Sequence, residues 1–95
     1  MATLDTNNKG ATAAEITLTT ETVFTFYIFS ESGSEGEYRV SLEVSPDSGT
    51  TWIPAGATLA RPGISTCQCV ATKARVKVVE AQGATSTVNV FLLAR

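Results

Sequence analysis

The chain has few of the side-chain combinations on which enzyme catalysis depends. It contains nine Asp and Glu residues and no histidine among its 95 residues. The acids are scattered through predicted loops and exposed strand positions, so no convergent pair for acid–base catalysis is expected. A Ser or Cys nucleophile would have only Lys or a carboxylate as its base, and the glycines stand singly in turns, without the helix that follows a phosphate-binding loop. We therefore expect no catalytic and no cofactor-binding residues and predict that the protein is not an enzyme.

The two cysteines, Cys67 and Cys69, form a C-x-C pair within a predicted strand, where both side chains point to one face. The Cα atoms of such a pair lie near or beyond the limit of about 7 Å for a disulfide. Two thiols without histidine or a second cysteine pair are too few ligands for a zinc site. We predict that both are reduced, small, buried hydrophobic side chains and that the chain holds no metal.

Residues 45–52, SPDSGTTW, match the Asp-box pattern S-x-D-x-G-x-T-W. In this turn the side chain of Asp47 would cap backbone N–H groups, Gly49 would supply a positive φ, and Trp52 would pack beneath the following strand. Ser45 and Thr51 bracket the turn as polar residues. Asp boxes recur once per blade in sialidase-type propellers, but a propeller needs about four or more blades of four strands. The single copy therefore predicts one hairpin and no enzyme.

Short apolar runs that alternate with polar residues fill most of the chain. The most apolar run is 22–30, with Phe24 and Phe26 on one face and Tyr27 and Phe29 on the other. A strand that is apolar on both faces is central in its sheet or partly covered by a partner. About seven such runs, turns every 8–12 residues or so and no sustained helical period predict an all-β fold. We expect a small antiparallel β-sandwich with immunoglobulin-like or jelly-roll-like strand order.

The length fits one domain, which we expect at residues 14–95, after a flexible N-terminal arm at residues 1–13. Pro54 should hold its short strand at a sheet edge or end it. The N-terminal stretch has no basic patch followed by an apolar run, so no signal peptide is predicted. No apolar stretch approaches the roughly 18 residues of a membrane span.

Charge is divided unevenly between the two halves of the chain. Residues 1–50 carry eight acids and two bases, a balance of −6, and residues 51–95 carry five bases and one acid, a balance of +4. The net charge of −2 gives nucleic acid no general attraction. Acidic strands can pair with basic strands inside one domain. Alternatively, identical copies meet head to tail around a ring.

The pattern EYRVSLEVSPDSGTTWIPAG, followed by RPGIS, ARVKVVEA and GATSTVNVFLLAR, resembles the small β-sandwich structural proteins of tailed bacteriophages. The match spans residues 38–95, and Ser48 stands where many relatives have a second glycine. The resemblance implies a capsid decoration (cement) protein, made in the host cytoplasm and bound to the capsid surface of the virion. Its partners would be the major capsid protein and itself, as a trimer or another symmetric ring. No catalytic residues carry over, because such proteins work by adhesion.

Contact residues are expected in three exposed segments: the arm, an acidic loop and a basic stripe along one strand. They are Leu4, Asp5, Asn7, Asn8, Glu31, Glu35, Glu37, Lys73, Arg75 and Lys77. The alternative is a glycan-binding or tail-fibre β-sandwich module in which Trp52 or Tyr27 stacks on sugars. We expect no nucleic-acid, membrane or small-molecule partner.

Overall fold

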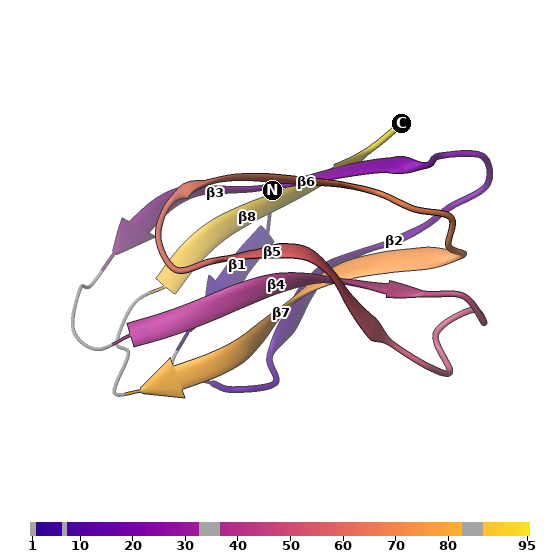
Figure 1. Cartoon of the computed structure of the whole chain (residues 1–95). Coiled ribbons are helices and arrows are strands. Elements are labelled where there is room, and N and C mark those ends of the chain that lie inside the picture. The colour runs from indigo at the N-terminus through magenta and orange to yellow at the C-terminus, as the bar shows by residue number, and fades with distance from the viewer. Residues whose placement is uncertain (1, 7, 33–36, 83–86) are drawn as a thin grey trace.

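The protein folds as two sheets packed face to face, seen in a computed structural model that describes residues 2–6, 8–32, 37–82 and 87–95 (Figure 1). Within these residues there are eight strands in two four-stranded sheets, which confirms the predicted all-β sandwich. The strands are β1 (Ala2–Asp5), β2 (Thr12–Thr17), β3 (Val23–Ser32), β4 (Glu37–Ser45), β5 (Ile53–Leu59), β6 (Gly63–Gln68), β7 (Lys73–Gln82) and β8 (Thr87–Ala94).

Strand order, which the sequence left open, is β1-β8-β3-β6 in one sheet and β2-β7-β4-β5 in the other. All of these neighbours pair antiparallel. The apolar strand β3 is central, between β8 and β6, which is one of the two possibilities expected from its apolar faces. β4 and β5 are neighbours joined by residues 46–52, so the predicted turn does close a hairpin.

The N-terminal segment does not form the unstructured arm that its polar composition predicts. Ala2–Asp5 form β1, which pairs with the edge of β8 and sets Leu4 opposite Val88. Leu4 is only 2% exposed, and β2 already begins at Thr12. The prediction failed because pairing with a distant strand satisfies the backbone groups of a segment whose own propensity for a strand is weak.

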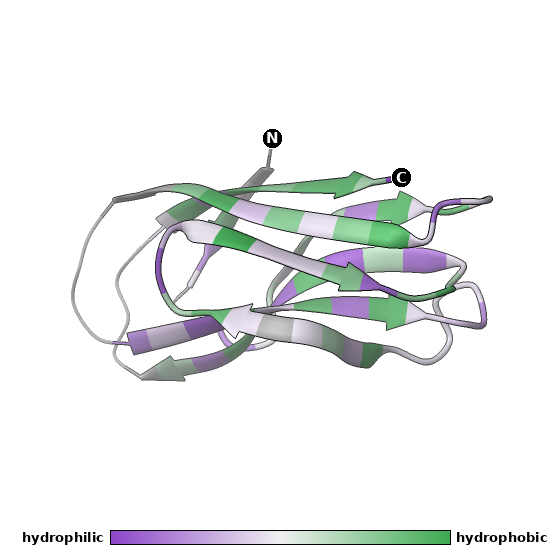
Figure 2. Ribbon diagram, turned by 45° about the horizontal axis from the view of Figure 1, so that its top comes forward, coloured by the Kyte–Doolittle hydropathy of each residue, from purple (hydrophilic) through white to green (hydrophobic). Residues whose placement is uncertain are grey.

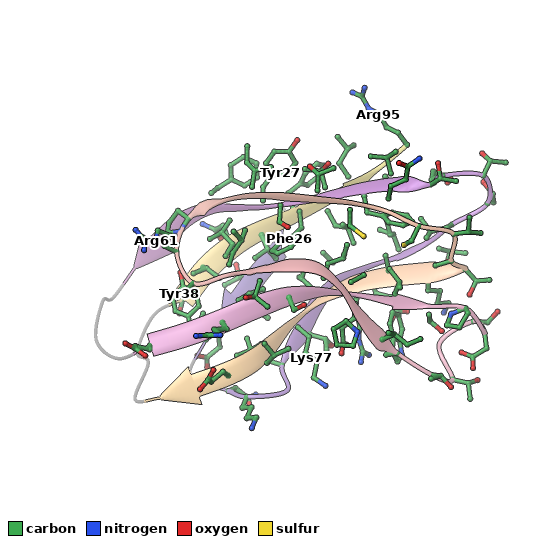
Figure 3. The ribbon with its side chains drawn as sticks, in the orientation of Figure 1. Phe26, Tyr27, Tyr38, Arg61, Lys77 and Arg95 are labelled. Carbon is green, nitrogen blue, oxygen red and sulfur yellow. The ribbon has the colours of Figure 1, made fainter. Side chains whose placement is uncertain are left out.

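The core lies between the two sheets and is built from alternate residues of the strands. Figure 3 shows Phe26 on the side of β3 that faces the other sheet, and Tyr27 on the opposite side. This inside-outside alternation agrees with the sequence prediction, and Tyr38 is buried as expected. The largest fully buried side chains that fill the core are Phe24, Phe26, Leu4, Leu42, Val40, Val76, Val78, Val88 and Val90.

β5 is an edge strand, which is where Pro54 can be tolerated because proline has no N–H to donate. The strand is longer than predicted and continues to Leu59. Within it Gly56 has φ +75°, and a Cβ atom at this position would lie 3.1 Å from Cβ of Cys67 on β6. The glycine therefore lets the edges of the two sheets approach each other closely.

Candidate functional site

Metal-ligating side chains are not clustered in the part of the chain that the structure describes. There, no three Cys, Asp or Glu side chains gather in a way that could hold a metal ion. The described residues also contain no helix long and apolar enough to cross a bilayer. Cys67 and Cys69 are half-buried thiols packed against the core, and burial together with the neighbouring Cys67 raises the pKa of Cys69. A raised pKa keeps this thiol protonated and unreactive.

The turn at residues 45–52 is closed by side-chain hydrogen bonds. Oδ1 of Asp47 accepts hydrogen bonds from Thr51 N–H at 2.7 Å and from the Ser45 hydroxyl at 2.8 Å. Ser45 Oγ in turn accepts the N–H of Gly49 at 2.8 Å. Gly49 has φ +98°. The capping role predicted for Asp47 and the positive φ predicted for Gly49 are therefore confirmed by the geometry.

Trp52 is held in place by two contacts. Its Nε1 donates to the carbonyl oxygen of Gly49 at 3.0 Å. The guanidinium carbon of Arg75 on β7 lies 4.0 Å from the centroid of the indole ring, a cation–π arrangement. Because Arg75 covers one face of the indole ring, that face is not open to a sugar, which argues against the alternative in which Trp52 is the stacking platform.

Thr72, which sequence reasoning missed, ties this turn to the segment before β7. Its Oγ1 donates to the carbonyl oxygen of Ser45 at 2.9 Å and accepts the N–H of Ser48 at 2.8 Å. Nothing in the local pattern indicates this role, because Thr72 lies more than twenty positions from both partners.

Gly49→Ala is expected to lower the free energy of unfolding by about 1–2 kcal/mol, because alanine is strained at φ +98°. The added Cβ would make only ordinary contacts, at 3.6 Å to Lys73 and 3.7 Å to Trp52. The matched control is Ser48→Gly, at φ +62°, which should change stability by less than about 0.5 kcal/mol. Urea denaturation measures both; equal effects of the two substitutions would contradict a specific need for glycine at position 49.

The turn should weaken in acid through Asp47. The hydrogen bond from Thr51 N–H, followed by those of the Thr51 and Ser45 side chains, lowers the pKa of Asp47 below its ordinary value of 3.8. A lowered pKa in the folded state gives stability that is complete above pH 3.8 and is lost as pH falls through the folded-state pKa. The stability difference between wild type and Asp47→Asn should therefore shrink as pH falls from about 5 to about 2 in urea titrations. A difference that is constant with pH would refute this role.

The outer face of the sheet β2-β7-β4-β5 carries ion pairs that join the two oppositely charged halves of the chain. Arg75 Nε lies 2.9 Å from Glu43 Oε1, and Lys77 Nζ lies 3.7 Å from Glu43 Oε2. Further pairs within the described residues are Lys73–Glu15 and Arg39–Glu80, each at 3.4 Å. These contacts favour internal pairing over the head-to-tail ring. Lys73, Arg75 and Lys77 are engaged with these acids and do not form the open basic surface that the sequence predicts.

The other predicted contact residues are dispersed. Leu4 is buried in the core and cannot take part in a surface contact, so this prediction was wrong. Asp5, Asn8 and Glu37 have exposed side chains. Glu31 lies in β3, while Asn7 and Glu35 fall outside the described residues.

Side chains on the outer side of the other sheet form a continuous apolar surface, the aromatic face, which is defined by Tyr27, Phe29, Ile64 and Phe91. Tyr27 on β3 lies directly between Ile64 on β6 and Phe91 on β8. The ring of Tyr27 lies 5.6 Å from that of Phe29, nearly parallel to it, and 6.1 Å from that of Phe91. Phe29 is 53% exposed, Ile64 64% and Phe91 37%.

The row next to the aromatic face is also uncharged. Thr25 lies between Thr66 and Leu93, and the two threonine hydroxyls share a hydrogen bond of 3.1 Å. In Figure 2, β3 has no strongly hydrophilic band from Val23 to Phe29, whereas such bands alternate along β4 and β7. The sandwich thus has one ion-paired outer face and one apolar outer face. Alternation in the sequence predicted Tyr27 and Phe29 on one side of their strand, but only the strand order brings Ile64 and Phe91 beside them.

Comparison with known proteins identifies a solved structure with the same fold. No protein-family model and no curated protein matches this sequence. The crystal structure of the SPBc2 prophage-derived protein YomS is similar, with a TM-score of 0.56 over 97% of this chain and 92% of that chain, at 10% sequence identity. This chain shares the fold of that protein. At so low an identity the likeness extends to the fold alone.

Proposed function

We propose that this protein is a structural component of a phage virion, a capsid decoration protein that binds across major capsid subunits and stabilises the head. The observation that carries the proposal is the contrast between the two outer faces. One is closed by its own ion pairs, and the other exposes Phe29, Ile64 and Phe91 to solvent. An apolar surface of this kind suits binding to another macromolecule.

Two further observations support a phage origin. The hairpin around residues 45–52 and the strands after it carry the pattern that resembles phage β-sandwich proteins. The solved protein of the same fold is described as prophage-derived.

The stabilising mechanism would be thermodynamic linkage. A protein that binds assembled capsid subunits, but not separate ones, favours the assembled shell by mass action. Each contact can be weak, because many copies act on one shell and their contributions add.

The proposal is tested by cosedimentation of the purified protein with shells of the major capsid protein encoded in the same genome. The expected result is saturable binding at a fixed ratio to capsid subunits and no binding to unassembled subunits. Free protein that stays in the supernatant at every concentration would overturn the proposal.

A second candidate function, glycan binding in a tail-fibre module, is favoured by one observation. The rings of Tyr27 and Phe29 are exposed or half-exposed and lie within 12° of parallel, an arrangement on which a sugar ring can stack. A glycan array tests this function. Selective glycan binding that Tyr27→Ala abolishes would support it, and an array without binding would count against it.

A further inference from the structure

We infer that the aromatic face binds the aromatic face of a second copy, forming a two-fold symmetric dimer held by an apolar contact. This inference concerns the protein in solution and does not depend on the capsid proposal. It differs from the head-to-tail ring that the sequence left as an alternative, because Lys73, Arg75 and Lys77, the basic stripe that would drive such a ring, are paired with acids within the domain.

The aromatic face is more than a set of isolated exposed residues. Ile64, Tyr27 and Phe91 form one row across three neighbouring strands, and Phe29 extends it along β3. Its rings lie within 5.6 to 6.4 Å of one another. Single exposed apolar residues are normal on a protein surface, but a contiguous patch marks a surface for contact. Aromatic residues in particular are enriched where protein interfaces are most buried.

A second copy is the partner that the charge distribution fits. In a two-fold contact each face meets an identical face, so a residue at the axis meets itself and a patch with charges of one sign brings like charges together. The rows Ile64–Tyr27–Phe91 and Thr66–Thr25–Leu93 contain no charged residue, although each copy carries a net charge of −2. The self-contact therefore brings no like charges together at its centre.

The size and shape of the sheet fit a modest dimer. Strands of 4, 8, 10 and 6 residues, about 4.8 Å apart and rising about 3.3 Å per residue, give a footprint of about 440 Å² per copy. The total of about 900 Å² lies below the standard size and fits a weak interface. Two twisted sheets can pack about 10 Å apart with their strand directions at about −30° to each other. The dimer contact would thus use the same kind of sheet packing as the core of each sandwich. We expect the dimer to have a dissociation constant on the order of micromolar.

Such a dimer would also suit a lattice. It leaves the outer faces of both β2-β7-β4-β5 sheets and the turns at residues 46–52 accessible. In the dimer these surfaces, each presented twice, would contact the capsid in place of the aromatic face. Two linked contacts bind a repeating surface more tightly than either contact alone.

The test is sedimentation equilibrium of the full chain from about 1 to 300 µM, with Phe29→Thr/Phe91→Thr as the test variant. The matched control is Ile53→Thr, because Ile53 is 49% exposed but lies on β5 in the other sheet. Wild type and control should rise from 10.0 kDa towards twice that mass, equally at low and high salt. The double variant should dimerise at least about 10-fold more weakly.

Three results would overturn the inference: a wild-type monomer at every concentration, a dimer that the double variant retains, or a dimer that high salt dissociates. Circular dichroism checks that the variants fold. If the double variant does not fold, Ile64→Thr, at the most exposed of these positions, replaces it. A monomer that still cosediments with shells would refute only this inference, whereas a dimer that does not cosediment would refute only the capsid proposal.

Discussion

Phe26→Ala is expected to lower the free energy of unfolding by about 3–5 kcal/mol, the largest effect of any substitution considered. Phe26 is 0% exposed, in the central strand of its sheet, with Ser65 and Leu92 as its cross-strand neighbours. Removing the ring leaves a cavity between the two sheets, which close-packed neighbours fill only in part. Since a domain of this size is stable by about 5–15 kcal/mol in total, the variant should be close to unfolding in urea or thermal denaturation.

The control is Phe29→Ala, three residues along the same strand. Its ring is on the outer side of the sheet and 53% exposed, so the loss should stay below about 1 kcal/mol when measured at protein concentrations that keep the chain monomeric. Equal losses for Phe26→Ala and Phe29→Ala would mean that the outer face is covered in the monomer, and would contradict an aromatic face open to solvent.

Glu43→Ala is expected to have the second largest effect, about 2–3 kcal/mol. The Glu43 side chain is buried, and it interacts with both Arg75 and Lys77. Its removal leaves the half-buried Arg75 guanidinium against Trp52 without its carboxylate partner. A cation that loses its partner in a partly buried position is costly, whereas an exposed pair contributes little.

Glu15→Ala provides the comparison, because Glu15 pairs with Lys73 at the surface and its side chain is half-exposed. Its loss should lower stability by less than about 1 kcal/mol. Urea denaturation of the two variants side by side decides the point. Should Glu43→Ala prove as mild as Glu15→Ala, the ion pairs on this face would contribute nothing beyond ordinary surface pairs.

Local features of this fold could be predicted from the sequence. The alternation in 22–30 predicted which side of β3 faces the core, and the spacing of Ser45, Asp47 and Gly49 predicted the turn that they close. Both depend on residues at most a few positions apart, so the pattern contains the information. The edge position of Pro54 follows in the same way from the missing N–H.

Features that depend on distant pairing could not be predicted. β1 owes its structure to β8 at the other end of the chain, and Thr72 reaches the turn only because β7 lies beside β4. The sequence alone predicts an exposed basic stripe on β7, whereas the strand order places this stripe beside Glu15 and Glu43. For the same reason the aromatic face needed the register of β3 with its two neighbours, since Ile64 and Phe91 are far from Tyr27 in the sequence.

On the proposed function, the two outer faces have different roles. The ion-paired face stabilises the single domain, and the aromatic face is the surface through which we propose that copies meet. An enzyme requires groups brought together around a substrate, whereas a decoration protein requires only stable surfaces repeated over a lattice.

The most direct test of capsid decoration is quantitative mass spectrometry of purified virions of the phage that, on this proposal, encodes the chain. We expect the protein at a fixed ratio to the major capsid protein, and we expect it to remain on heads separated from tails. Its absence from purified virions, or its presence on tails alone, would contradict the proposed function.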